Sequence, residues 1–165
     1  MFIQKEKSEE KNDNLAIKRI ELEEFIKKNI PLANFMNFRI EELKRNFIKL
    51  SAPIKPNDNH YGTAFGGSLA ILGILAGWGL LHFNMLQEKI NGTIVIKEGT
   101  MKFIRPALSD FEAINNSLNN DLWESFKKDL LEKGKAEIKM ESKLYSQYAN
   151  VALHVGSFVG LMQKS

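Results

Sequence analysis

A single uninterrupted apolar segment, residues 69–81, constrains the fold of this chain more than any other feature. It contains no charged or ionisable side chain, it ends just before His82, and it follows Gly66-Gly67-Ser68. The segment is longer than a usual strand and the glycine pair is a suitable helix entry, so we predict a helix. A helix that is apolar all round is normally buried all round, and this segment falls short of the roughly 20 residues that span a bilayer. We therefore predict a core helix and no membrane insertion.

Glycines within the predicted helix indicate close packing. Gly73, Gly77 and Gly79 would each cost about 1 kcal/mol relative to alanine in a helix interior. A glycine allows a neighbouring backbone to approach more closely than any other residue does. The sequence therefore predicts that a sheet or a second helix presses against this helix.

Composition indicates one soluble domain. The 165 residues are 44% hydrophobic, include 11 Phe and no Cys, and carry a net charge of +3 with basic and acidic residues interspersed. Such a chain can bury one core without disulfides, and a nucleic-acid binder usually concentrates its basic residues. We expect a cytoplasmic protein with no signal peptide and no nucleic-acid partner, in which residues 1–14 are a disordered tail and residues 15–165 form a single domain.

The remaining elements follow from periodicity and from breakers. We predict helices at residues 15–29 and 121–132, a further turn at 31–36, and strands at 43–52, 93–105, 110–118, 135–144 and 150–162. Gly99 is a candidate bulge in the predicted strand at 93–105, and Gly134 ends the predicted helix at 121–132. Strict alternation at 135–144 indicates one solvated face, and the last two strands should pair as an antiparallel hairpin. The order predicts an α+β domain in which a curved antiparallel sheet wraps the central helix.

The segment PNDNHYGTAFGGSLAILGILAGW, residues 56–78, adds a resemblance to this outline. It resembles the signature of the putative thioesterase domain family of the hotdog fold, a domain that also occurs fused behind GNAT acetyltransferase domains, and the resemblance covers residues 15–162. The resemblance implies a homodimer or tetramer that acts on acyl thioesters of coenzyme A (acyl-CoA) or of acyl carrier protein (acyl-ACP), within fatty acid metabolism.

The resemblance also directs attention to the start of the central helix. Many hotdog thioesterases have His-Gly-Gly before the helix and a carboxylate about two turns inside it. Here the turn is Phe65-Gly66-Gly67, the carboxylate position near Ile74 is apolar, and no Asp or Glu occurs between Asp58 and Glu88. Backbone N–H groups at the helix start can donate to a thioester carbonyl that gains negative charge.

Polar residues in the preceding loop are the candidate catalytic groups. Asn59 or His60 can hold or deprotonate the attacking water, with Asp58 or a carboxylate from another subunit as orienter. The alternative is that both only hydrogen-bond the loop. The full set of candidates is catalytic Asn59, His60 and Gly67, and substrate-binding Tyr61, Thr63, Phe65, Gly66, Ser68 and Arg105.

Several of these residues can also have a purely structural role. Gly66-Gly67 can be only a tight helix entry, Ser68 is better read as a helix cap than as a nucleophile, and Arg105 can be a solvated residue at a strand end. His82 and His154 are expected to be structural. Three such dispersed histidines make no zinc-ligand pattern, so we expect no metal and no cofactor.

Two classes of function remain. The first is an acyl-thioester hydrolase that uses the loop at residues 59–68. The second is a non-catalytic acyl-CoA or acyl-ACP binding protein of the same fold, for which the absent helix carboxylate is the natural explanation. A purely structural dimer without a ligand is a third possibility.

Overall fold

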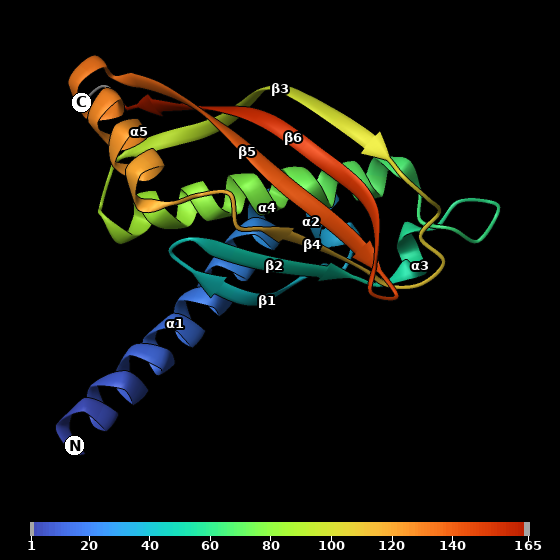
Figure 1. Ribbon diagram of the computed structural model, residues 1–165, viewed down its shortest axis with the longest axis horizontal. Helices are drawn as coiled ribbons and strands as arrows, with labels where there is room; N and C mark the ends of the chain where they lie inside the picture. Colours follow the sequence, from blue (N-terminus) through green and yellow to red (C-terminus); the bar gives the residue numbers. More distant parts are fainter. Residues whose placement is uncertain (1, 164–165) are drawn as a thin grey trace.

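A long helix, α4 (Gly66–Gln87), runs along the inside of a curved six-stranded antiparallel sheet in this computed structural model (Figure 1). The structure describes residues 2–163, and the side chains among these from residue 14 onward. The predicted α+β class with a sheet around a central helix is confirmed, and the predicted apolar segment lies within α4. The protein core forms where the inner face of the sheet meets this helix.

The sheet has the spatial order β1-β2-β4-β5-β6-β3, and each neighbouring pair is antiparallel. Strand β3 is therefore an edge strand, and within residues 2–163 it pairs with β6 alone. The remaining elements are α1 (Phe2–Asn29), α2 (Pro31–Phe35), β1 (Arg39–Lys44), β2 (Phe47–Ala52), α3 (Ile54–Asn57), β3 (Gly92–Phe103), β4 (Phe111–Asn115), α5 (Asn120–Lys133), β5 (Lys135–Ser146) and β6 (Ala149–Met162).

Two glycines explain how the sheet approaches α4 so closely. A Cβ atom at Gly73 would lie 2.7 Å from Cβ of His154, and one at Gly77 would lie 2.8 Å from the ring of Phe158. Both neighbours belong to β6, so the predicted close packing of a sheet on the glycine-rich helix is confirmed. Helix α4 is long and apolar enough to cross a membrane, but 67% of its most apolar window is buried inside the protein. That burial is typical of the core helix of a soluble protein.

The first predicted strand, residues 43–52, is wrong in its extent. The structure has a hairpin there, in which β1 and β2 pair on either side of a turn at Arg45 and Asn46. A register shift between Ile40 and Glu42 interrupts β1. Its buried residues, Ile40 and Leu43, therefore stand three apart instead of two, which hides the strand from a search for alternation.

The later elements follow the prediction more closely. The strand predicted at 93–105 is β3, which ends at Phe103, and its register shift lies between Ile96 and Glu98, so the extra residue is Lys97 and not Gly99. Strands β5 and β6 form the predicted hairpin. Gly134 ends α5 with a φ of 72°, a left-handed conformation that suits glycine. Trp123, Phe126 and Leu130 are the buried residues of this helix, and Leu122 is exposed.

The N-terminal helix is longer than predicted. Its end at Asn29 was expected, but its backbone begins at Phe2, so residues 2–14 are helical where we predicted a disordered tail. Figure 1 shows the first turns of α1 extending away from the sheet. The side chains of residues 1–13 lie outside the described part of the chain, and a single domain over residues 15–165 stays a prediction.

Candidate functional site

The loop before α4 is held at both ends by backbone and amide contacts. The buried side chain of Asn57 donates from Nδ2 to the carbonyl oxygens of Met36 and Pro53, both at 2.8 Å. Its own carbonyl accepts from the N–H of Phe65 at 2.8 Å. A bridge between Asp58 and Ala64 closes the loop into a narrow hairpin. The loop therefore presents residues 59–63 as a fixed tip beside the helix.

Asn59 organises this tip. Its Nδ2 donates to Oγ1 of Thr63 at 2.9 Å, and its Oδ1 accepts from the N–H groups of Tyr61 and Thr63. Its own N–H donates to the carbonyl of Thr63. Such asparagine contacts two to four residues along the chain are typical of a loop-stabilising side chain.

The neighbouring side chains at the tip point to solvent. His60 and Tyr61 are exposed and their rings contact each other, with centroids 3.8 Å apart. Asp58 pairs with Lys55, and the hydrogen bond from this lysine lowers the pKa of the Asp58 carboxyl. The ionic partner of Asp58 is thus Lys55, and among the described residues no hydrogen bond or ion pair joins Asp58 to His60.

The first turn of α4 carries free hydrogen-bond donors. The helix begins after Phe65, and no side chain caps it, so the prediction of Ser68 as a cap is wrong. In the described part of the chain, the N–H groups of Gly66, Gly67 and Ser68 donate to no partner. Two phenylalanine rings crowd this turn, because a Cβ at Gly66 would lie 3.2 Å from Phe103 and one at Gly67 would lie 2.4 Å from Phe65.

A cavity of about 360 Å³ opens beside this helix start. It brings together three of the predicted site residues, Thr63, Gly66 and Arg105, which come from the loop, the helix and the segment after β3. Apolar residues and Pro106 complete its wall. Asn59, His60, Tyr61, Phe65, Gly67 and Ser68 do not line it, although the last three of these adjoin residues that do.

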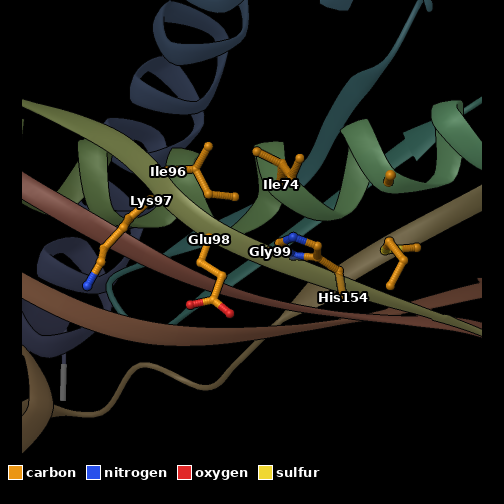
Figure 2. Close-up of a pocket in the computed structure, with 8 residues that line it drawn as sticks. Ile74, Ile96, Lys97, Glu98, Gly99 and His154 are labelled. Carbon is orange, nitrogen blue, oxygen red and sulfur yellow. The ribbon is translucent and has the colours of Figure 1, made fainter.

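A second cavity, of about 300 Å³, lies further along α4 and also faces β3. Figure 2 shows it from the β3 side, with Ile74 on the helix and the imidazole of His154 beside Gly99. Ala70, Ile96 and Met101 add apolar wall. Lys97 and Glu98 also line the cavity, and in Figure 2 their side chains extend away from Ile74.

His154 is the residue that sequence reasoning missed. It is 1% exposed, and neither ring nitrogen has a hydrogen-bond partner among the described residues. Burial lowers the pKa of His154 below its ordinary value of 6.5, so the ring is neutral at pH 7. We expected a structural histidine whose hydrogen bonds are satisfied, and the structure corrects that expectation. Only the cavity reveals it, because nothing in the sequence of β6 distinguishes this histidine.

Two kinds of chemistry are therefore available along α4. The helix start offers backbone N–H donors that suit an anion or a polarised carbonyl oxygen. The second cavity offers a neutral imidazole, which has one donor and one acceptor nitrogen.

Comparison with protein families agrees with this architecture. The model of a family described as "Putative thioesterase (yiiD_Cterm)" matches residues 19–162, which is most of the chain and includes both cavities.

Solved structures give the same result at the level of the fold. A protein of unknown function from Chlorobaculum tepidum TLS is 28% identical, with a TM-score of 0.84 over 88% of this chain and 94% of that one. A structure from Pseudomonas aeruginosa described as a "Probable Thioesterase" is 25% identical, with a TM-score of 0.76 over 90% and 95%. One described as a "putative thioesterase" from Shewanella oneidensis is 24% identical, with a TM-score of 0.79 over 89% and 99%.

Proposed function

Because the chain belongs to the yiiD C-terminal thioesterase family over residues 19–162, we propose that it hydrolyses acyl thioesters of coenzyme A or acyl carrier protein. The observation that carries the proposal is the first turn of α4, whose unpartnered N–H groups stand next to the cavity that Gly66 lines. A thioester carbonyl placed there accepts these donors. The absence of cysteine supports a cytoplasmic location.

The proposed reaction depends mainly on stabilising the negative charge that develops on the carbonyl oxygen. Water adds to the carbonyl carbon, the carbonyl oxygen gains negative charge, and the C–S bond then breaks to release a thiol and a carboxylic acid. Preorganised N–H donors at Gly66 and Gly67 stabilise that oxygen, and removing one such donor typically lowers kcat by roughly 10²–10³. Arg105, exposed at the rim of the cavity, suits a phosphate of the carrier.

We propose that Asn59 and His60 position or activate the water. The amide of Asn59 is committed to the loop, so its role is to hold the tip in place. His60 is then the titratable group at the exposed tip of the loop. Tyr61, Thr63, Phe65 and Ser68 stay proposed as substrate contacts around this turn.

A non-catalytic acyl-CoA or acyl-ACP binding protein is the second candidate. The observation that favours it is the lining of the cavity at the helix start, where Arg105 is the sole ionisable side chain of the described residues. A cavity without an acid or base can bind a thioester without hydrolysing it.

Thiol release separates these candidates. We would measure it with acyl-CoA and acyl-ACP substrates from acetyl to palmitoyl, at high protein concentration, for the native chain and for Asn59→Ala and His60→Ala. Hydrolysis that falls in a variant supports the thioesterase and its loop. Thermal protection by the same substrates without thiol release supports the binding protein.

We also propose a homodimer or a higher oligomer formed through the free edge of β3. In the part of the chain that the structure describes, this strand has no neighbour on one side, and it exposes Val95, Ile96 and Phe103. Natural proteins seldom leave a long apolar edge uncovered, and a second copy of the same edge satisfies the backbone groups of both.

A further inference from the structure

Both cavities lie along one side of α4, and we call the residues of that side a stripe. Gly66, Ala70, Ile74 and Trp78 follow one another at four-residue intervals, so they lie on the same side of the helix. The first cavity lies between this stripe and Phe103, and the second lies between it and Ile96 to Met101. At the far end, Nε1 of Trp78 donates to the carbonyl of Ile94 at 2.9 Å. We call this stretch, from Gly66 to Trp78 beneath β3, the α4–β3 seam.

The seam is apolar apart from His154. The neighbouring polar groups on β5 and β4 are already engaged, since Oγ of Ser142 donates to the carbonyl of Gly73 and accepts from Asn115. Lys97 donates to Glu137 on the outside of the sheet, and Glu98 is exposed. A buried imidazole with two unpaired nitrogens is costly unless a partner satisfies it, and the structure brings no protein group of the described residues to it.

Three glycines make room for the imidazole. A Cβ at Gly73, Gly99 or Gly156 would lie 2.7 Å, 3.0 Å or 2.8 Å from an atom of His154. The contact with Gly99 is the most informative, because it is Nε2 of the ring that lies 3.0 Å from a Cβ at this position, so a side chain there would crowd the nitrogen. The cavity that Ile96, Gly99 and Met101 line is therefore the side from which a ligand can approach Nε2.

The distance from the start of α4 to His154 limits which part of a substrate can reach the imidazole. Gly73, which His154 contacts, is seven residues beyond Gly66, or about 10 Å along the helix axis. A general base needs to come within roughly 3 Å of the proton that it removes. A thioester carbonyl bound at the start of α4 is therefore too far from His154 of the same protomer. The part of the substrate that reaches the imidazole is the acyl chain.

We propose that His154 determines substrate specificity by hydrogen-bonding a hydroxyl group on the acyl chain, so that the preferred substrates are hydroxyacyl thioesters. This inference rests on the proposed thioester hydrolysis at the helix start. A hydroxyl group is the best match because it both donates and accepts, and so pairs with either neutral tautomer of the ring. Three bonds of extended chain span roughly 3.3–3.6 Å, which puts the hydroxyl about eight bonds from the carbonyl carbon.

The test compares three substrates of equal chain length: octanoyl-CoA, 3-hydroxyoctanoyl-CoA and 8-hydroxyoctanoyl-CoA. For the native chain we expect kcat/KM to be about 10- to 100-fold higher with the 8-hydroxy substrate than with the other two, the range for one hydrogen bond to a buried neutral group. His154→Met replaces the ring by an apolar side chain of similar size. It should remove this preference and leave hydrolysis of octanoyl-CoA intact.

Two further variants serve as a control and as a conservative substitution. His82→Met changes a half-buried histidine beyond the end of the seam, whose Nε2 has no partner among the described residues, and should leave the preference unchanged. His154→Gln retains a hydrogen-bonding group and should retain part of the preference, even if His154→Met folds poorly. An equal loss of activity on all three substrates, or an unchanged preference in His154→Met, would overturn the proposal.

Failure of the proposed function has a different outcome. If the native chain releases no thiol from any substrate, hydrolysis is wrong, and the hydroxyl preference is then read from dissociation constants by calorimetry. Tighter binding of 8-hydroxyoctanoyl-CoA that is lost in His154→Met, with a shift of the His154 ring ¹⁵N signals on binding, supports the role of His154. Equal affinities for the three compounds contradict it.

Discussion

His154 of β6 packs directly on Gly73 of α4, so closely that a Cβ atom at position 73 would lie 2.7 Å from Cβ of the histidine. This contact joins the central helix to the middle of the sheet. It also explains why a glycine is present in a helix interior, where it costs about 1 kcal/mol relative to alanine. The close approach of β6 offsets that cost, and it positions the imidazole beneath β3.

Gly73→Ala should destabilise the protein. The added methyl group meets His154 Cβ and, at 3.4 Å, Leu144 Cδ1, and such overpacking typically costs about 1–3 kcal/mol. Urea unfolding followed by circular dichroism measures the effect, with Ser125→Ala on the exposed face of α5 as the control. Unchanged stability of Gly73→Ala would show that β6 does not press on the helix as described.

Gly66→Pro should abolish most of the proposed catalysis without unfolding the helix. Position 66 is the first of the helix, where proline is well tolerated but supplies no N–H. We expect kcat to fall by roughly 10²–10³. Gly66→Ala is the matched control, because it also adds a Cβ next to Phe103 but keeps the N–H. If both variants lose activity equally, crowding by Phe103 is responsible and the donor role is wrong.

Asn59→Ala and His60→Ala should separate loop structure from chemistry. Asn59 makes three side-chain hydrogen bonds within the loop, so its removal should lower the free energy of unfolding by about 1 kcal/mol and raise KM. His60 is exposed, and its removal should leave stability unchanged while lowering kcat if it activates water. A full set of kcat, KM and unfolding data for both variants checks this. An unaffected kcat in His60→Ala would remove His60 from the mechanism.

Val95→Lys should weaken the proposed dimer. Val95 is 46% exposed on the edge strand β3, and lysine on an edge opposes pairing with another strand. Light scattering at micromolar concentration should give about twice the 18.8 kDa chain mass for the native protein and a lower mass for the variant. Lys128→Ala, on the exposed surface of α5, is the control and should leave the mass unchanged. A native mass of one chain would contradict the dimer.

Stability should fall as the pH is lowered below 6.5. Burial lowers the pKa of His82 and of His154 below 6.5 in the folded state. Below pH 6.5 the unfolded chain therefore binds more protons than the folded chain at these positions, and the free energy of unfolding decreases until the lowered pKa values are reached. Above pH 6.5 both states are neutral there and the contribution is flat.

Unfolding free energies at pH 7.5 and 5.5 test this expectation. His82→Phe preserves the aromatic stack with Phe25 and Trp78 and should reduce the pH dependence. Ser125→Ala, which changes no titratable group, should leave the pH dependence unchanged. The carboxyl groups with lowered pKa, Asp58, Glu88 and Glu137, contribute only toward pH 4.5 and below, outside this range. Equal stability at the two pH values would contradict the prediction.

Much of the fold was predictable because its signals are local. The apolar segment of α4, the alternation of β5 and the glycine stop of α5 each depend on residues close together in the chain. Strand β1 was not predictable in this way, since its register shift breaks the alternation that identifies a strand. The length of α1 escaped prediction because its first residues are mostly polar, with little apolar periodicity.

The candidate site was predictable only in part. The sequence pointed to the helix start, and the structure places Thr63, Gly66 and Arg105 around one cavity there. The side-chain amide of Asn59 hydrogen-bonds within the loop. That arrangement depends on side-chain geometry, which the residue type alone does not reveal.

By itself, the sequence determined that a glycine-rich apolar helix lies at the centre of an α+β domain, and which family signature marks its start. Both are properties of contiguous residues. Only the tertiary structure decided that β3 is an edge strand of the sheet and that His154 is buried beneath it, with no hydrogen-bond partner among the described residues. The physical reason is that strand order and hydrogen-bond satisfaction depend on contacts between distant segments, such as Gly73 with His154, and no local pattern encodes them.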